Sequence, residues 1–370
     1  MPFLTMLIKP ASSLCNMKCK YCFYCDEAKN RSTASCGIMT ADTAEILVKR
    51  AYEYADGVCD FIFQGGEPTL AGLEYYENFV ALCKKYNTKN VKTSFSIQTN
   101  GYNVSEEMAV FFYKNGFLAG LSLDGYADVH NALRCDSFNR VMNTARLFDR
   151  VGVQYNILSV VTGYSARHGA KIYNFFKKSG FKYLQFIPQI DGFGEKYDFS
   201  LTPKKYADFL KTTFDLYFSD FMSGNYVSIR NFDNYVRILD GQPAECCGMN
   251  GECCCNFTVE SDGSVYPCDF YALDELRLGN LHESSLEELK SSKTANDFIN
   301  SSKYIDPKCR ECKYFSLCLG GCRRWNLGAF SGRKSLFSTY ISRVKGTFLV
   351  PAFSSLGLLD TSKYSTLSSG

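Results

Sequence analysis

Between residues 3 and 190, short β-rich runs alternate six times with longer amphipathic runs, and this alternation limits the possible folds more than any other feature. Runs such as "DFIFQGG" and "KTSFSIQTNG" have the composition of strands, whereas "TADTAEILVKRAYEYA" repeats apolar residues at helical spacing. Six strand–helix steps predict a parallel sheet with right-handed crossovers. We therefore expect an α/β fold, a partial (β/α)6 TIM-like barrel that binds ligands at the carboxyl ends of its strands.

Polar loops follow four of the predicted strands. A cysteine-rich segment follows the first strand, "QGGEP" (64–68) the second, "QTNG" (98–101) the third and "SLDG" (122–125) the fourth. Such residues also form ordinary turns, and that explanation is sufficient for any single loop. Because the four loops share one rim of the sheet, together they indicate a binding site.

Cysteine is the residue type that most narrows the chemistry, with eighteen copies against three histidines. The start "MPFLTMLIKP" lacks the pattern of a signal peptide, and no run of eighteen apolar residues suggests a membrane span. We therefore expect a cytoplasmic protein, with no membrane partner, whose reduced thiols bind metal in all-thiolate sites. The net charge of +3 argues against a nucleic-acid partner.

Three cysteines, Cys15, Cys19 and Cys22, form a compact Cys-x3-Cys-x2-Cys loop, and Cys25 follows at once. A structural zinc site needs four ligands, usually from two Cys-x2-Cys pairs. A four-iron cluster held by three cysteines instead keeps one iron open for an exogenous ligand, which suits catalysis. Cys25 is interpreted as a bystander, because unpaired cysteines commonly fill small apolar spaces.

A second cysteine-rich region follows the predicted barrel. We place a boundary near residue 235 and expect a barrel domain at 1–234, a cysteine-rich domain at 235–325 and an atypical tail at 326–370. The segment "FTVESDGSVYPCDF" alternates around Asp262-Gly263 and predicts a β-hairpin. A zinc-ribbon module is the structural alternative for this region.

In the loop with Cys15, Cys19 and Cys22, an aromatic residue, Tyr21, directly precedes the last cysteine. This pattern resembles the motif of the radical S-adenosylmethionine (SAM) superfamily. The "GGEP" at 65–68 resembles the motif by which that family contacts the SAM amine. The resemblance implies a [4Fe-4S] cluster on the three cysteines, whose fourth iron chelates SAM. It also implies reductive cleavage of SAM to a 5′-deoxyadenosyl radical.

The same resemblance implies a set of SAM-contacting residues at the strand ends. Tyr21 would brace the cluster loop through its backbone, Arg134 would meet the SAM carboxylate and Ile190 would contact the adenine. The full set is Tyr21, Gln64, Gly65, Gly66, Glu67, Ser122, Asp124, Arg134 and Ile190. For Arg134 the alternative is a solvated loop position, and His130 is expected to be structural.

The second region resembles the SPASM extension of radical SAM enzymes, which carries two auxiliary four-iron clusters. The resemblance assigns Cys247, Cys253, Cys268 and Cys322 to one cluster, and Cys309, Cys312 and Cys318 with one later cysteine to the other. In this chain no cysteine follows Cys322. A surplus thiol could substitute, the second cluster could be labile or absent, or the tail could be a frameshifted or altered end, which we favour.

Residues 1 to about 325 resemble the anaerobic sulfatase-maturating enzymes, through segments such as "FQGGEPTLAGLE" and "CGMNGECCCNFTVESDGSVYPCDFY". The resemblance implies oxidation of Cys or Ser in a Cys/Ser-x-Pro-x-Arg segment of an unfolded sulfatase to Cα-formylglycine. Asp269 matches the general base of the family, with a turn or helix-capping aspartate as the alternative. An auxiliary cluster would accept one electron, and an electron donor such as flavodoxin or ferredoxin would reduce the first cluster.

Two other functions compete with this one. Another SPASM peptide maturase could form thioether crosslinks, but many such enzymes carry an N-terminal precursor-binding domain, for which a first strand beginning at Phe3 leaves no room. A non-catalytic iron–sulfur or zinc scaffold is the alternative of another class. A scaffold has no need of an open three-cysteine site beside "GGEP".

Overall fold

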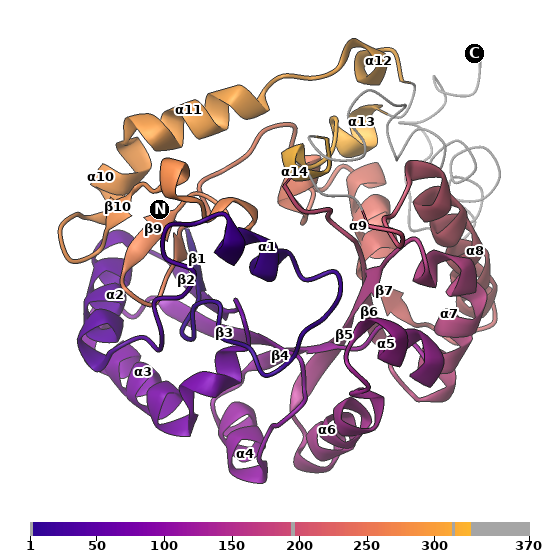
Figure 1. Ribbon diagram of the computed structural model, residues 1–370, viewed down its shortest axis with the longest axis horizontal. Coiled ribbons are helices and arrows are strands. Elements are labelled where there is room, and N and C mark those ends of the chain that lie inside the picture. Colours follow the sequence, from indigo (N-terminus) through magenta and orange to yellow (C-terminus); the bar gives the residue numbers. More distant parts are fainter. Residues whose placement is uncertain (1–2, 194–196, 313–314, 327–370) are drawn as a thin grey trace. The chain divides into compact units, whose positions relative to one another are not determined.

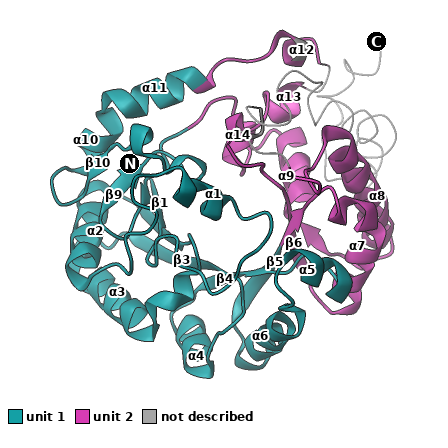
Figure 2. Cartoon of the chain, viewed as in Figure 1, with its two compact units in different colours: residues 1–158, 254–301 teal, residues 159–253, 302–370 magenta. Residues whose placement is uncertain are grey.

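The computed structural model describes residues 3–193, 197–312 and 315–326. The chain divides into two compact units, one of residues 1–158 with 254–301 and one of residues 159–253 with 302–370 (Figure 2). Each unit therefore combines two separate stretches of the sequence. Apart from Asn326, the predicted tail lies outside the described residues.

The first unit is built on a parallel sheet (Figure 1). Its parallel strands are β1 (Leu4–Ile8), β2 (Val58–Phe63), β3 (Lys92–Thr99), β4 (Leu118–Ser122) and β5 (Gln154–Val161), the last of which continues into the second unit. They pair in sequence order, with Leu4 opposite Cys59 and Cys59 opposite Thr93. Sequential order is expected, because each helical crossover returns the chain beside the strand that it left.

Helices connect these strands. They are α1 (Phe23–Lys29), α2 (Ala41–Tyr54), α3 (Leu73–Tyr86), α4 (Glu106–Lys114), α5 (Ala127–Leu133) and α6 (Phe138–Val151), with a 3-10 turn η1 (Pro68–Ala71). The Thr40 side chain caps α2 by accepting a hydrogen bond from the backbone N–H of Thr43 at 3.2 Å. The helix then buries Leu47, Val48 and Ala51, which lie on one face at helical spacing.

Aromatic side chains fill the core of the first unit. Phe61 and Phe63 of β2 are fully buried, and both rings meet Phe79 of α3 edge to face, with centroids 5.1 and 5.0 Å apart. Edge-to-face pairs add to the free energy of burying apolar area, by about 1 kcal/mol each. This packing fixes the strands whose carboxyl ends carry the polar loops.

A hairpin continues the sheet beyond β1. Its strands are β8 (Thr258–Val259) and β9 (Ser264–Tyr266), followed by β10 (Gly279–Asn280); β8 pairs with β1 in parallel. The predicted turn at Asp262-Gly263 is confirmed, and Gly263 has a φ of +82°, which glycine adopts without strain. The 3-10 turns η4 (Asp269–Tyr271) and η5 (Asp274–Leu276) and helices α10 (Leu286–Ser291) and α11 (Lys293–Ser302) follow.

The second unit contains the sixth predicted strand. Strand β6 (Tyr183–Pro188) pairs in parallel with the short β7 (Ser228–Ile229). Its other elements are η2 (Ser165–His168), α7 (Gly169–Lys178), α8 (Pro203–Met222), α9 (Arg230–Leu239), η3 (Cys247–Met249), α12 (Pro307–Arg310), α13 (Phe315–Cys318) and α14 (Arg323–Asn326). Phe186 of β6 meets Phe209 of α8 edge to face at 4.9 Å, so the long helix packs on this strand.

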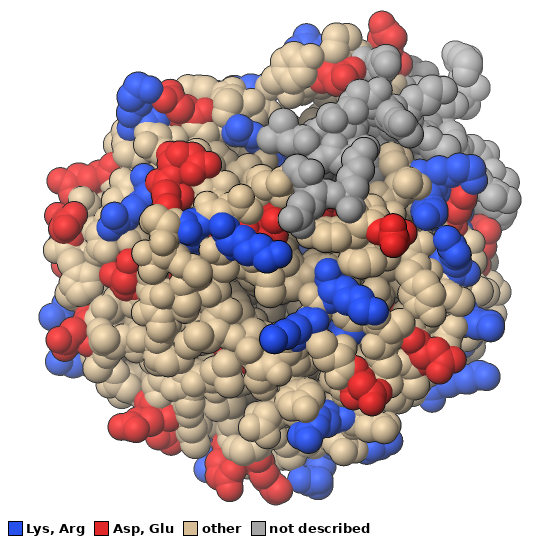
Figure 3. Space-filling view, viewed as in Figure 1, with Lys and Arg blue, Asp and Glu red and all other residues tan. Residues whose placement is uncertain are grey.

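The six predicted strands and their intervening helices are therefore confirmed, each close to its expected position. The chain passes from one compact unit to the other near residues 158, 253 and 301. The boundary near residue 235, which we place between the barrel and the cysteine-rich segment, is of a different kind and stays a prediction. Within the described ranges, no helix combines the length and apolar character that crossing a membrane requires. On the face drawn in Figure 3, basic and acidic side chains are interspersed.

Candidate functional site

The loop between β1 and α1 carries the three-cysteine motif. Cys15 is exposed, and Cys19 and Cys22 are partly buried. The backbone N–H of Cys22 donates to the carbonyl of Cys19 at 3.2 Å, and the Asn100 amide donates to the Cys15 sulfur at 3.7 Å. Burial raises the pKa of the Cys19 thiol to about 12, although Arg134 opposes this change. The loop thus presents three thiols close together at the carboxyl end of the sheet.

Cys25, which is interpreted as a bystander, contacts a cysteine of this motif. It is exposed, and its side chain shares a hydrogen bond with Cys22. This contact lowers the pKa of the Cys25 thiol to about 7. Its absence from the ligand set stays a prediction.

The "GGEP" loop packs directly on the cysteine loop, and glycine is essential for this approach. A Cβ atom on Gly66 would lie 2.2 Å from the carbonyl oxygen of Leu14, and Gly66 has a φ of +47°. The backbone N–H of Glu67 donates to the same oxygen at 2.8 Å. The two loops predicted to bind the cluster and SAM are therefore adjacent.

The Glu67 carboxylate is engaged within the protein. It accepts hydrogen bonds from the hydroxyls of Thr69 at 2.7 Å and Thr99 at 2.8 Å and from the backbone N–H of Asn100 at 2.7 Å. Burial raises the pKa of this carboxyl, and the donors oppose the rise. The observed role of the side chain is to join the ends of β2 and β3, while the predicted SAM contact of Glu67 stays a prediction.

A second set of predicted residues forms one buried network. Nη1 of Arg134 donates to the Tyr21 hydroxyl at 2.7 Å, and this hydroxyl donates to the Asp124 carboxylate. Nη1 of Arg134 also lies 3.8 Å from Oδ1 of Asp124. Arg134 is 6% exposed, so the alternative interpretation of Arg134 as a solvated loop residue is wrong. Ser122 ends β4 two residues before Asp124.

His130 supports this network, as expected for a structural residue. Its Nδ1 accepts from the backbone N–H of Asp124 at 3.3 Å, and its Nε2 lies 2.8 Å from the Ser137 hydroxyl. Ser137 in turn donates to the carbonyl of Arg134 at 2.7 Å. Burial, with a contribution from Arg134, lowers the pKa of His130 to about 3, so the ring is neutral at pH 7.

Asp269 lies in η4 of the same unit and contacts Gln64. Nε2 of Gln64 donates to Oδ2 of Asp269 at 3.1 Å and also to the Tyr24 hydroxyl. The Cys268 sulfur lies 3.6 Å from Oδ1. Burial raises the pKa of the Asp269 carboxyl, and the Cys268 contact opposes the rise. Gln64, predicted as a SAM contact, is thus also a direct partner of the predicted base, and Tyr24 is a site residue that the sequence analysis missed.

The remaining predicted ligands are divided between the units. Cys268 belongs to the first unit, and Cys247, Cys253, Cys309, Cys312, Cys318 and Cys322 belong to the second. A Cβ on Gly248 would lie 3.0 Å from Cβ of Cys322, so Cys247 and Cys322 are close. The backbone N–H of Cys312 donates to the carbonyl of Cys309 at 3.1 Å. Ile190, also in the second unit, is 8% exposed just after β6.

The residues of the first unit fit a cluster and SAM. Among the described residues, no three His, Cys, Asp or Glu side chains converge as ligands of a single metal ion, whereas a four-iron cluster takes its thiolates at separate corners. The loop supplies three such thiols. Nε of Arg134 is buried and has no hydrogen-bond partner among the described residues, which suits an anionic group such as the SAM carboxylate.

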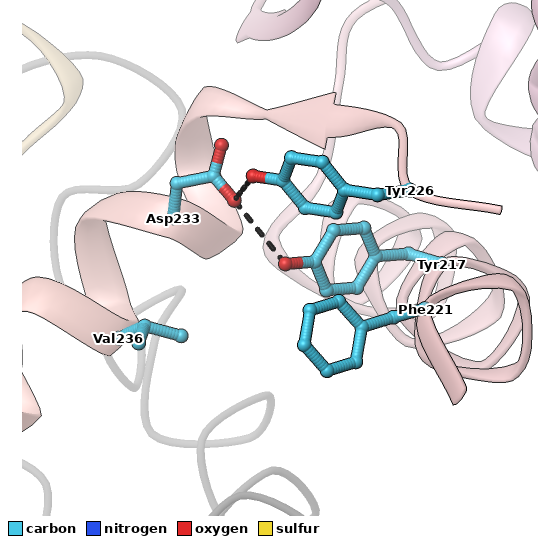
Figure 4. A pocket seen from close by; sticks show the side chains of 5 residues that line it. All are labelled: Tyr217, Phe221, Tyr226, Asp233 and Val236. Carbon is cyan, nitrogen blue, oxygen red and sulfur yellow. Dashed lines mark hydrogen bonds between the residues drawn. The ribbon is translucent and has the colours of Figure 1, made fainter. Parts of the chain in front are cut away.

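A separate pocket lies in the second unit between α8 and α9 (Figure 4). Its empty volume, which includes adjoining solvent, is about 490 Å³, and its lining consists of Tyr217, Phe221, Tyr226, Asp233 and Val236. The Asp233 carboxylate accepts from the Tyr226 hydroxyl at 3.0 Å and the Tyr217 hydroxyl at 3.2 Å. None of the predicted site residues lines this pocket.

Two family models match the chain in the order that the motifs suggest. Residues 10–176 match the radical SAM superfamily, and residues 247–313 match an iron–sulfur cluster-binding domain, SPASM. The chain is also 49% identical to the cysteine-type anaerobic sulfatase-maturating enzyme of Clostridium novyi (strain NT), over 88% of this chain and 89% of that protein. The chain belongs to the anaerobic sulfatase-maturating enzymes.

Further relatives of this sulfatase-maturating enzyme agree. The serine-type enzyme of Bacteroides thetaiotaomicron is 29% identical over 86% of this chain and 82% of that protein. The solved structure of native anSMEcpe with bound AdoMet and the Cp18Cys peptide matches with a TM-score of 0.85 and 46% identity, over 93% of this chain and 95% of that chain. The predicted family, the partial-barrel fold with its SPASM domain, the enzymatic character and the [4Fe-4S] and SAM cofactors are confirmed. The scaffold alternative is wrong.

Proposed function

We propose that this enzyme oxidises the cysteine of a Cys-x-Pro-x-Arg segment in an unfolded sulfatase to Cα-formylglycine. The observation that carries the proposal is the Asp269 carboxyl, which Gln64 orients at 3.1 Å in the same unit as the three-cysteine loop. Preference for cysteine is supported by the identity of 49% to a cysteine-type relative against 29% to a serine-type one.

The roles of the residues follow from the chemistry. When bound, the cluster and SAM together supply a radical that removes one hydrogen atom from Cβ of the substrate. Asp269 takes the proton of the substrate thiol, so its carboxylate must lie within hydrogen-bonding distance of that thiol. The substrate radical must then lose one further electron to become a thioaldehyde, and an auxiliary cluster on the cysteines of the SPASM segment would be the acceptor. Water then replaces sulfur, which leaves as hydrogen sulfide, and the product is the aldehyde.

The other side chains bind and orient the cofactor. Cys15, Cys19 and Cys22 would hold the cluster, and Gly66 permits the close approach of the "GGEP" loop. Arg134, held by Tyr21 and Asp124, would direct its unsatisfied Nε to the SAM carboxylate. This arrangement would fix SAM without a mobile charged group, because the guanidinium is already buried and oriented.

We also propose that the enzyme acts on a polypeptide, receives electrons from a small carrier protein and works in the cytoplasm. The Cp18Cys peptide bound to the solved relative supports a polypeptide substrate, and a flavodoxin or ferredoxin would supply the first electron. A cytoplasmic location suits thiolate ligands, which need a reducing compartment.

The test is an anaerobic assay of the reconstituted enzyme with SAM, a strong reductant and two peptides that differ only in Cys or Ser before x-Pro-x-Arg. Mass spectrometry should detect the aldehyde together with 5′-deoxyadenosine. The aldehyde should form faster on the Cys peptide than on the Ser peptide. Deoxyadenosine without any aldehyde on either peptide would refute the proposed reaction. Faster turnover of the Ser peptide would refute the cysteine preference.

A further inference from the structure

Four buried charges in the first unit have no role in the proposed function. They are Lys9, Glu27, Arg31 and Glu260, whose side chains are between 0 and 3% exposed. Nζ of Lys9 lies 2.7 Å from Oε1 of Glu260 and 3.6 Å from Oε2 of Glu27, and Nη1 of Arg31 lies 2.5 Å from Oε1 of Glu260. Each of the two cations thus contacts a buried carboxyl group, which lowers the cost of burying the positive charges.

Lys9 supports the loop that carries Gln64. It directly follows β1, and its aliphatic stem lies against Gly65, where a Cβ atom would be 2.5 Å from Cγ of Lys9. Its ammonium lies 5.2 Å from the ring centroid of Tyr24, the second partner of Gln64. The position of Gln64 therefore depends on a lysine fixed at its far end by two carboxylates.

Glu27 connects α1 to the segment of the predicted base. Its Oε1 accepts from the backbone N–H of Ala272 at 3.0 Å, directly after η4, which begins with Asp269. Its Oε2 has no hydrogen-bond partner among the described residues and faces the Lys9 ammonium. The rings of Phe23 and Phe270, 5.0 Å apart and edge to face, form a second contact between α1 and η4.

We propose that Lys9 and Glu27 are positioning residues that hold Asp269 and Gln64 in the geometry for proton transfer. Lys9 acts through the Gly65 loop and Glu27 acts through Ala272. The inference rests on the proposed function, because it assigns the geometry of the base in that reaction. Neither residue gains or loses a proton or an electron in the step. Small displacements matter here, since an error of about 1 Å in a reacting group costs roughly 100-fold in rate.

The decisive test compares two variants of Glu27, one without and one with a side-chain oxygen that can accept a hydrogen bond. Glu27→Ala removes the oxygen that Ala272 N–H requires, whereas Glu27→Gln keeps an amide oxygen at the same place. Glu53→Ala is the control, since Glu53 is an exposed helical glutamate paired with Arg50. For each protein one measures formylglycine formed per 5′-deoxyadenosine, the KM for the peptide and the hydrogen exchange of the Ala272 amide.

We expect Glu27→Ala to lower the ratio of formylglycine to deoxyadenosine at least tenfold, with the peptide KM within threefold of the parent. Glu27→Gln should restore the ratio to within threefold, and Glu53→Ala should leave it unchanged. The Ala272 amide should exchange at least tenfold faster in Glu27→Ala than in Glu27→Gln. A merely structural defect would lower both products together and leave their ratio constant.

An unchanged ratio in Glu27→Ala, or equal losses in the Ala and Gln variants, would overturn the inference. If Glu27→Ala does not fold, Lys9→Met replaces it, because methionine keeps an unbranched stem against Gly65; an unchanged ratio there overturns the inference as well. If the parent makes deoxyadenosine but no aldehyde, the proposed function fails. In that case slow exchange of Ala272 in Glu27→Ala would separately overturn the contact on which the positioning depends.

Discussion

Glu260 provides a quantitative test of the buried charges. Its side chain is fully buried, and its Oε1 lies 2.7 Å from the Lys9 ammonium and 2.5 Å from the Arg31 guanidinium. Burial alone would raise its pKa, but Lys9 and Arg31 outweigh burial and lower the pKa to about 2. Glu260→Gln keeps the shape of the side chain and removes the negative charge that both cations face.

Two estimates of the cost agree. The change from an ordinary pKa of 4.5 to about 2 corresponds to about 3 kcal/mol of unfolding free energy, at roughly 1.4 kcal/mol per pKa unit. Removal of one partner from a buried ion pair costs about 3 to 5 kcal/mol, because the other charges stay buried. We therefore expect Glu260→Gln to lower the free energy of unfolding by about 3 kcal/mol at pH 7.

The sign of the pH dependence follows from the lowered pKa. The folded state holds the carboxylate ionised, so the contribution is complete above the unfolded pKa of 4.5 and declines as the pH falls toward about 2. The difference between parent and Glu260→Gln should shrink to about 2 kcal/mol at pH 3.5.

The assay is urea unfolding of the metal-free protein under reducing conditions, followed by circular dichroism at both pH values. Asp208→Asn, which removes the partner of Lys204 in a surface ion pair, is the control and should change little. A loss below about 1 kcal/mol in Glu260→Gln at pH 7, or a difference that grows at low pH, would show that Lys9 and Arg31 do not stabilise the ionised Glu260 carboxylate.

Three further outcomes are expected. Gly66→Ala should abolish SAM cleavage and lower the melting temperature, because its Cβ would lie 2.2 Å from the Leu14 oxygen; calorimetry and a deoxyadenosine assay check this. Arg134→Met should weaken SAM binding at least tenfold in equilibrium dialysis, since it removes the donors that Tyr21 and Asp124 hold in place, and unchanged affinity would contradict the assignment. Cys19→Ala should abolish deoxyadenosine formation while Cys25→Ala keeps at least half of it; an inactive Cys25→Ala enzyme would add Cys25 to the ligand set.

The fold of the first 190 residues could be predicted because its signals are local. Each strand is a short β-rich run, and the longer helices between the strands show apolar residues at helical spacing. The hairpin at Asp262-Gly263 was equally predictable, since the turn residues are adjacent in sequence. The motif loops were found from spacing and then assigned roles by resemblance.

The connections between these loops could not be predicted. Lys9 and Glu260 are separated by 251 positions, and nothing in the sequence indicates that a lysine at the end of a strand is buried. Arg134 shows the same difficulty, because a polar segment such as "HNALRCDS" suggests an exposed loop, yet its guanidinium is buried against the Tyr21 hydroxyl and the Asp124 carboxylate. Buried polar networks depend on long-range packing, to which local composition is insensitive.

The product ratio of Asp269→Asn shows most directly whether Asp269 is the general base. Asparagine keeps the size of the side chain and an oxygen that can accept from Gln64, but it cannot take a proton at neutral pH. We expect deoxyadenosine formation in the presence of the Cys-x-Pro-x-Arg peptide to stay within threefold of the parent, while formylglycine falls by about 100-fold or more, as expected for loss of a general base. Equal loss of both products, or an unchanged yield of formylglycine, would contradict it.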